Sequence, residues 1–262
     1  MKGRVKLHVL DLGWLGMDRR VLLADAPPGE RVDVPVSAYV VEHPAGRVLF
    51  DTGCHPHCMG GEGLWPPAFQ EAFPWQGGAE CQLPNRLAAL GLTPDDFSAV
   101  VLSHMHNDHA GCVEFFRRTP LLVHAHEISA ALGAQDDTSY VRAEVARWRG
   151  LGLDWQPVIR DRKLNDAVTV LAWGSGHAAG MLGLHVRLPK SGDILLVSDA
   201  VYCAENFAPH FRPPGSLQDA AGWEHTARHI AALAERLRAQ VWFGHDATQF
   251  ATLRHARDGY YD

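Results

Sequence analysis

The most informative stretch of this chain reads Ser103-His104-Met105-His106-Asn107-Asp108-His109-Ala110-Gly111. It places three imidazoles and one carboxylate within six residues, directly after residues 100–102, an apolar run that predicts a buried strand. Imidazole and carboxylate are ligands that Zn²⁺, Fe²⁺, Mn²⁺ and Co²⁺ accept. In a turn at the end of a strand, His104 and His106 can face one ion while Asp108 and His109 face a second. The stretch therefore predicts a site for two metal ions.

Short β-branched runs and helical stretches alternate along the rest of the chain. Strands are expected at residues 5–10, 37–41, 48–50, 100–102, 121–123, 168–172, 184–188, 194–198 and 241–243. Helices are expected at residues 85–90 and 139–148, and from a cap at Ser216 to about residue 237. The strands form two sets, one in each half of the chain, and helices accompany both sets. This arrangement predicts a single α/β domain over residues 1–262, an αββα sandwich with two mixed sheets between layers of helices.

Residues 54–82 interrupt this pattern. The segment is rich in glycine and proline and carries four large aromatic residues, Trp65, Phe69, Phe73 and Trp75. A long irregular segment inside a compact domain is usually functional or part of an interface. We expect it either to hold the apolar part of a substrate at the rim of a pocket or to form the contact of a homodimer.

Composition narrows the classes of partner. The 262 residues carry a formal net charge of −6 and no long run of Lys or Arg, which argues against a nucleic-acid partner. No apolar stretch is long enough to span a membrane, and the first residues lack the apolar core of a secretory signal. Five cysteines, an odd number, favour reduced thiols over a disulfide framework. We therefore expect a cytoplasmic protein without a nucleic-acid or membrane partner.

The HxHxDH pattern of residues 104–109 resembles the signature of the metallo-β-lactamase superfamily. Matching elements stand at or just past expected strand ends, in the family's order: Asp51-Thr52-Gly53, Gly176-His177, Ser198-Asp199 and Gly244-His245-Asp246. The resemblance runs from about residue 36 to the C-terminus. It implies a metal-dependent hydrolase with two divalent ions, zinc by default and iron, manganese or cobalt as alternatives.

The resemblance also implies a ligand set. One ion would be held by His104, His106 and His177. The other would be held by Asp108, His109 and His245, and Asp199 would bridge both ions. Asp51 would orient a ligand imidazole by a hydrogen bond, or it would only cap a turn.

Within the superfamily, residues 198–207 resemble the N-acyl homoserine lactonases and their relatives, including 4-pyridoxolactonase. These enzymes place a tyrosine three residues after the bridging aspartate, and Tyr202 stands at that position. The resemblance implies that a lactone ring is opened, with an N-acyl homoserine lactone (the substrate of quorum quenching) as the leading substrate. Tyr202 would donate a hydrogen bond to the carbonyl oxygen, and Asp108 would pass a proton to the departing ring oxygen. Tyr202 could otherwise be a core residue with a satisfied hydroxyl group.

Several positions depart from the family pattern. The usual TPGH is Gly174-Ser175-Gly176-His177 here, residues 181–183 read Met-Leu-Gly where a second histidine is common, and Asn107 replaces an aromatic residue. No metal ligand is lost, but the particular lactone stays open. The alternatives are another lactone, such as one like pyridoxolactone, or a thioester of the glyoxalase II kind. The alternative outside enzymes is an inactive metal-binding scaffold.

Two other histidine-rich segments could suggest a second metal site. Residues 54–58 read Cys-His-Pro-His-Cys, but alternate positions can face opposite ways, so a loop at the pocket rim is favoured over zinc. Residues 124–127 read His-Ala-His-Glu at the start of an expected helix, with no third or fourth ligand in sight. We interpret that pair as surface or packing histidines.

Overall fold

The computed structural model describes residues 5–133 and 139–262. A first sheet has the strand order β4-β1-β2-β3-β5-β6-β7. Its strands are β1 (Lys6–Asp18), β2 (Arg31–His43), β3 (Gly46–Phe50), β4 (Trp75–Gln76), β5 (Phe97–Val101), β6 (Leu121–His124) and β7 (Trp155–Val158). The pairs from β3 to β7 are parallel and the others antiparallel, so the sheet is mixed.

A second, mixed sheet comes from the C-terminal half and has the order β12-β11-β10-β9-β8. Its strands are β8 (Arg162–Lys163), β9 (Val168–Gly174), β10 (Met181–Leu188), β11 (Gly192–Ser198) and β12 (Gln240–Phe243). Only β11 and β12 pair in parallel within it.

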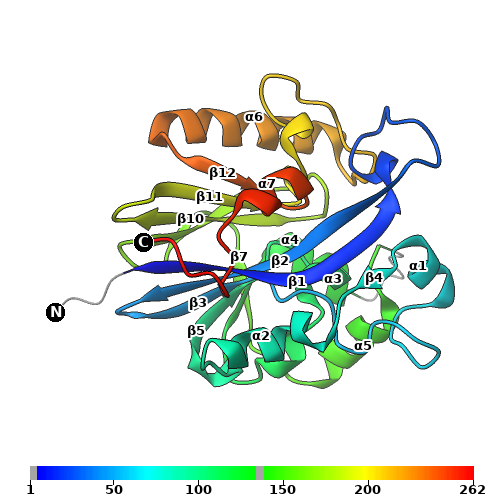
Figure 1. Cartoon of the computed structure of the whole chain (residues 1–262), viewed down its shortest axis with the longest axis horizontal. Coiled ribbons are helices and arrows are strands. Elements are labelled where there is room, and N and C mark those ends of the chain that lie inside the picture. Colours follow the sequence, from blue (N-terminus) through cyan, green and yellow to red (C-terminus); the bar gives the residue numbers. More distant parts are fainter. Residues whose placement is uncertain (1–4, 134–138) are drawn as a thin grey trace.

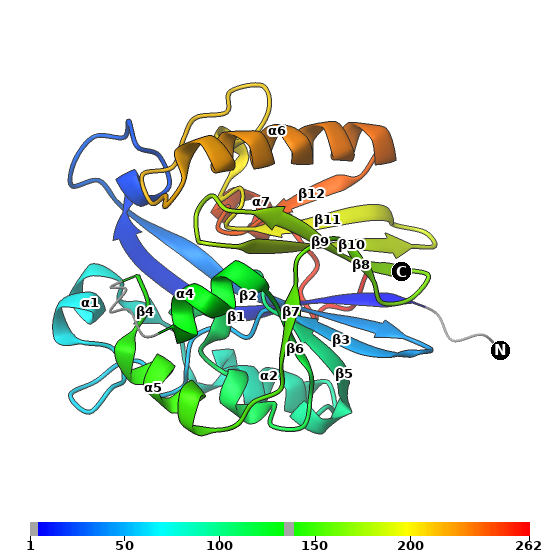
Figure 2. The same cartoon turned by 180° about the vertical axis from the view of Figure 1, so that it is seen from behind.

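Helices cover the outer faces of both sheets (Figures 1 and 2). The α-helices are α1 (Pro67–Ala72), α2 (Leu83–Ala89), α3 (Asn107–Ala110), α4 (Ala125–Leu132), α5 (Arg142–Gly150), α6 (Ala220–Leu237) and α7 (Ala247–Thr252). Helix α6 lies over the second sheet, and α2, α4 and α5 lie on the side of the first sheet. The layers confirm the predicted αββα sandwich. Within the described ranges, no helix is both long and apolar enough to cross a membrane.

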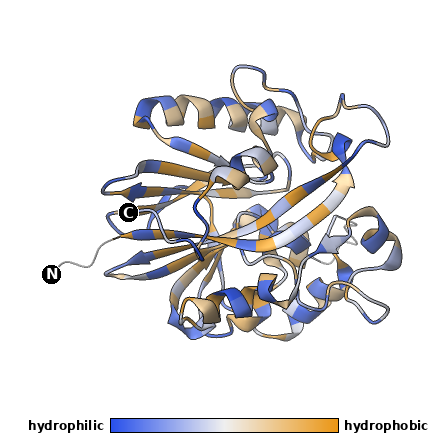
Figure 3. Ribbon diagram, in the orientation of Figure 1, coloured by the Kyte–Doolittle hydropathy of each residue, from blue (hydrophilic) through white to orange (hydrophobic). Residues whose placement is uncertain are grey.

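Apolar faces explain the layers. Alternate residues of the strands, such as Val9, Val41 and Leu184, meet in one buried cluster to which both sheets contribute. Helix α6 buries a stripe at helical spacing against the second sheet, including Trp223 and Ile230. Figure 3 shows the hydrophobic colouring gathered in the strands, with more polar colouring in the outer loops.

Two element boundaries differ from the prediction. The strand expected at residues 5–10 continues to Asp18. A bulge that contains Gly13 in a left-handed conformation (φ +92°) shifts the register of β1 against β2, and the pairing of the two strands resumes after it. The expected cap at Ser216 is wrong. Asp219 caps α6 instead, since its side chain accepts the N–H of Gly222, whereas the Ser216 carbonyl is hydrogen-bonded to His177.

Candidate metal centre

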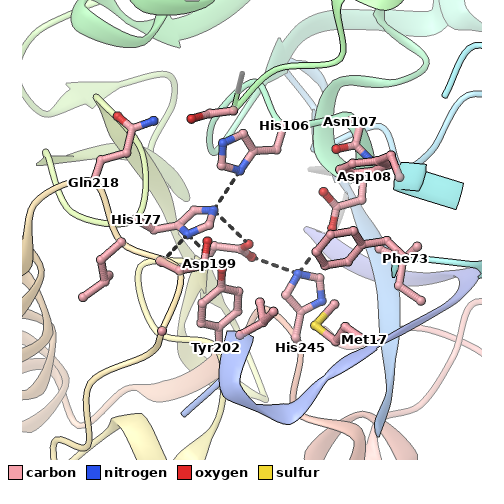
Figure 4. A pocket seen from close by; sticks show the side chains of 17 residues that line it. Met17, Phe73, His106, Asn107, Asp108, His177, Asp199, Tyr202, Gln218 and His245 are labelled. Carbon is pink, nitrogen blue, oxygen red and sulfur yellow. Dashed lines mark hydrogen bonds and ion pairs between the residues drawn. The ribbon is translucent and has the colours of Figure 1, made fainter. Parts of the chain in front are cut away.

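All seven residues expected as metal ligands lie close together. They follow the carboxyl ends of strands from both sheets: His104 comes after β5, and His177, Asp199 and His245 come after β9, β11 and β12. The other three lie at the short helix α3: His106 is its N-cap residue, and the helix itself carries Asp108 and His109. Figure 4 shows side chains from these separate segments pointing toward one another.

The first ligand group consists of three imidazoles. His106 Nδ1 lies 3.0 Å from His104 Nε2 and 2.8 Å from His177 Nε2. Three ring nitrogens at such distances cannot all be satisfied by hydrogen bonds between themselves, because each neutral ring has one donor and one acceptor. Ligand atoms about 2.1 Å from a tetrahedral ion lie roughly 3.4 Å apart, close to this spacing. The donor set therefore fits one divalent cation.

The second ligand group mixes carboxylate and imidazole. Asp108 Oδ2 lies 3.3 Å from His109 Nε2 and 3.4 Å from His245 Nε2. Although Nε2 of His109 is buried, no hydrogen bond from the described part of the chain satisfies it. A buried nitrogen beside carboxylate oxygens, with its lone pair unused, fits a second cation.

Asp199 lies between the two groups. Its Oδ1 is 3.2 Å from His245 Nε2 and 3.3 Å from His109 Nε2, on the side of the second group. Its Oδ2 is 3.5 Å from His177 Nε2 and faces the first group. One oxygen toward each group is the geometry that a bridging ligand needs.

Hydrogen bonds to the opposite ring nitrogens fix the imidazoles. His109 Nδ1 lies 2.9 Å from Asp51 Oδ2, His245 Nδ1 lies 2.9 Å from the carbonyl oxygen of Pro35, and His177 Nδ1 lies 3.0 Å from that of Ser216. Asp51 also accepts the backbone N–H of Ser103 at 2.7 Å. Such partners orient the rings and keep the other nitrogen free for a metal.

The two ligand groups differ in the charge that their side chains carry. Burial, with neighbouring imidazoles, lowers the pKa of His106 to about 3, so this ring is neutral at pH 7. Burial alone would raise the pKa of Asp199, but His245 and His109 outweigh it and hold that pKa well below its usual range. Burial also opposes a charge on His245, yet Asp199 and Asp108 raise its pKa to about 10. The interior thus holds ionised carboxylates that need positive charge nearby.

A cavity of about 310 Å³ opens onto the two groups. Its lining is polar on the side of the ligands, with His106, Asp108, His177, Asp199, Tyr202 and His245. Its apolar lining comes from β1, from the 3-10 turn that follows it and from the segment of α1: Leu15, Met17, Val21, Phe69 and Phe73. Figure 4 shows Met17 and Phe73 on the side of Asp108 and His245, and Gln218 on the side of His177.

Tyr202 lies in the cavity wall with its hydroxyl beside the first ligand group. The hydroxyl oxygen is 2.8 Å from His177 Nδ1, and the ring stacks on His245 with centroids 5.5 Å apart. Burial raises its pKa well above the usual value, so the phenol stays protonated. Because Nε2 of His177 faces the ligand group, its Nδ1 carries the ring hydrogen, which the carbonyl oxygen of Ser216 accepts at 3.0 Å, so Nδ1 has no lone pair to accept the phenol hydrogen. The phenol hydrogen can then be donated elsewhere.

The Cys-His-Pro-His-Cys segment of residues 54–58 does not gather ligands. His55 Nε2 is paired with Glu114 at 3.2 Å, and its Nδ1 accepts the N–H of His57 at 3.0 Å. In the part of the chain that the structure describes, the groups able to hold a metal contain only the seven residues above. All five cysteines are free, as expected.

Comparison with known proteins identifies the family. The model of the metallo-β-lactamase superfamily matches residues 31–238. The chain belongs to the metallo-β-lactamase superfamily. It is similar to the N-acyl homoserine lactonase AiiB of Agrobacterium fabrum, with 44% identity over 98% of this chain and 99% of that protein. It is also similar to the N-acyl homoserine lactonase AiiA of Bacillus thuringiensis subsp. kurstaki, with 28% identity over 95% of this chain and 96% of that protein.

Solved structures agree with this assignment to the metallo-β-lactamase superfamily. An N-acyl homoserine lactone hydrolase with the product N-hexanoyl-L-homoserine bound at its catalytic metal centre has a TM-score of 0.88 and 27% identity, covering 99% of this chain and 100% of that chain. The superfamily's motifs are visible in the sequence, whereas nothing in the sequence assigns a role to Leu15, Met17 or Val21. Apolar residues that line a cavity have no sequence signal that separates them from core residues.

Proposed function

We propose that this chain is a metal-dependent hydrolase that opens the ring of an N-acyl homoserine lactone. One observation carries the proposal: a cavity with an apolar wall ends at two ligand groups that share Asp199, with the Tyr202 hydroxyl beside them. Relatives over nearly the whole chain are named N-acyl homoserine lactonases, which supports the same substrate class.

The two sides of the cavity suit the two parts of such a substrate. An acyl chain would lie against the apolar side, where Met17, Phe69 and Phe73 exclude water. The lactone ring would lie on the polar side, with its carbonyl group next to the two ligand groups. Asn107 and Gln218 also line the cavity and offer amide groups to polar atoms of the substrate.

The ligand residues and Tyr202 divide the reaction between them. The seven ligands would hold two divalent ions, which supply Lewis acidity that activates water near neutral pH and polarises the carbonyl group. Tyr202 donates its hydroxyl hydrogen to the carbonyl oxygen, where negative charge develops as water adds. The ring C–O bond then breaks, and the alkoxide that leaves needs a proton. Asp108, which faces the cavity with one oxygen among the ligands, holds the proton from the attacking water and passes it to that alkoxide.

Three finer assignments are part of the proposal. Zinc is the proposed metal, since a set of imidazoles and carboxylates binds it well, although such a set also accepts iron, manganese and cobalt. The five free cysteines support work in the reducing cytoplasm. The aromatic segment, of which Phe69 and Phe73 line the cavity, is also proposed as a contact between two copies, to be tested by the mass of the protein in solution.

A hydrolysis panel tests the function. Purified protein with about two equivalents of zinc is followed by a pH indicator on N-hexanoyl homoserine lactone, a lactone without an acyl chain, a glutathione thioester and a β-lactam. We expect rapid acid release from the first compound and slower release from the second. Turnover of the thioester alone would assign a glyoxalase II-like activity, and no turnover of any compound by fully metal-loaded protein would contradict the proposal.

A further inference from the structure

A buried carboxylate stands outside the ligand set, on the first turn of α4. The Glu127 side chain is 0% exposed. Its Oε1 accepts the backbone N–H of Met105 at 2.8 Å, and its Oε2 accepts the backbone N–H of Gly180 at 3.2 Å. Each carboxylate oxygen therefore accepts a backbone N–H.

The two partners belong to the segments that carry the first ligand group. Met105 lies between His104 and His106, and Gly180 is three residues after His177. The first segment follows β5 of the first sheet, and the second joins β9 to β10 of the second sheet. Helix α4 packs against β6, β7 and α5 (Figure 2), so one fixed carboxylate links a segment of each sheet.

Neighbouring contacts hold the same arrangement. Tyr140 lowers the pKa of Glu127, and its ring lies 5.5 Å from the ring of His106. A Cβ atom on Gly180 would lie only 2.1 Å from His124 Nδ1, so glycine lets this segment approach the start of α4 closely. The N–H of Gly180 reaches Glu127 because of that close approach.

A second buried carboxylate offers a contrast. Glu144 of α5 is 1% exposed and accepts a hydrogen bond from Trp65 Nε1 at 3.1 Å. Its other oxygen receives no hydrogen bond from residues 5–133 or 139–262. Burial raises the pKa of both acids, to about 7 for Glu127 and about 8 for Glu144. The two residues share type and burial, but only Glu127 is bonded to the segments that carry ligands.

We propose that Glu127 is a positioning residue that sets the separation between the His104–His106 pair and His177, and so determines how tightly the first ligand group holds its ion. The inference rests on the metal centre of the proposed function. It predicts a selective effect: the first group, built on the two linked segments, should depend on Glu127, whereas Asp108, His109 and His245 should not.

The test compares Glu127→Gln with Glu144→Gln as a matched control. The amide can accept one N–H, but its NH₂ group then faces the other N–H, donor against donor, and one segment is released. Metal binding is measured by titration of the metal-free protein with Zn²⁺ against a chromophoric chelator. We expect wild type and Glu144→Gln to bind two ions tightly, and Glu127→Gln to bind one ion as tightly and the other about 10- to 100-fold more weakly.

Two further measurements separate positioning from general destabilisation. The absorption spectrum of the Co²⁺-loaded Glu127→Gln protein should change for one ion only, and at saturating zinc its kcat should fall while KM changes little. If Glu127→Gln does not fold, Glu127→Asp keeps the charge but shortens the link, and the same selective weakening is expected. Two tight sites in whichever of these variants folds would overturn the inference, as would equal weakening of both sites. Wild type that binds fewer than two ions would instead contradict the proposed metal centre.

Discussion

Among the segments with histidines two residues apart, one follows β5 and another follows β3, and only the first of these two collects metal ligands. The ligand loop, residues 103–111, follows β5, and the Cys-His segment, residues 54–58, follows β3. In the ligand loop, His104 and His106 turn nitrogens toward a common point that His177 also faces. In the Cys-His segment, both ring nitrogens of His55 are already paired, and His57 is exposed. The capacity to bind metal thus depends on lone pairs left unused and on ligands from elsewhere, and less on the local spacing.

The Cys-His segment and the residues before it nevertheless support the ligand loop. Thr52 donates both its N–H and its hydroxyl hydrogen to the carbonyl oxygen of His109, at 2.7 and 2.8 Å. Cys112 Sγ donates to the carbonyl oxygen of Cys54. One segment presents ligands, and the other holds the backbone that presents them.

The largest expected difference comes from truncating one histidine in each segment. His106→Ala should bind one ion fewer and lose about a thousand-fold in kcat/KM, since an ion in such a site contributes several kcal/mol to catalysis. His57→Ala should keep the metal content and activity of wild type. Metal analysis and lactone kinetics on both variants check this; equal metal loss in the two would erase the distinction between the segments.

Removing one hydroxyl group tests the ligand side more finely. Tyr202→Phe should keep both ions but reduce kcat by about 100-fold, the usual effect of losing one donor to a developing negative charge. Metal content and kcat are measured on the same preparation. An unchanged kcat would show that Tyr202 has only a packing role.

The free energy of unfolding should depend on pH through Glu144, a buried residue near the Cys-His segment. Burial raises the pKa of Glu144 to about 8 from an ordinary 4.5, so the native state holds a proton that the unfolded state releases. Its contribution to stability is complete below pH 4.5 and is lost as pH rises toward 8. The loss is roughly 3 kcal/mol by pH 7. Urea unfolding from pH 5 to 8 should show this decline in wild type and a shallower one in Glu144→Gln; parallel declines would contradict it.

The smallest effect concerns the contact between the two segments. A Cβ atom on Gly111 would lie 2.4 Å from the backbone nitrogen of His55, and the backbone there cannot yield as a side-chain tip would. Gly111→Ala should therefore reduce the free energy of unfolding by about 1–3 kcal/mol. Gly91→Ala, where a Cβ atom meets nothing within 4 Å in the described chain but φ is +71°, measures the cost of a backbone conformation alone. An equal or smaller loss in Gly111→Ala would show that the close approach is not limiting.

Much of the fold and of the candidate site could be predicted because both leave local signals. Buried β-branched runs marked the strands, and polar residues at their ends marked the places where ligands meet. The length of β1 could not be predicted, because Gly13 breaks the alternation at a bulge that only pairing with β2 makes favourable. The cap of α6 was misplaced because Ser216 and Asp219 are both good caps, and the tertiary bond from His177 to Ser216 decides between them.

Glu127 shows a different limit. At the start of a helix, a glutamate reads as an exposed residue that favours the positive end of the helix dipole. Its burial depends on Met105 and Gly180, which are distant in sequence and donate through backbone groups that every residue possesses. No pattern of residue types could have indicated that role.

The position of Asp199 between two ligand groups has a consequence for the abundance of the protein in a cell. Metal ions would bind the native arrangement of the two ligand groups, which the unfolded chain lacks, so binding would stabilise the native state. Each ion present at a thousand times its dissociation constant would add about 4 kcal/mol of stability. Newly made chains that meet no metal would therefore open more often and be degraded sooner. The abundance of the protein would follow the metal supply, before any question of catalysis arises.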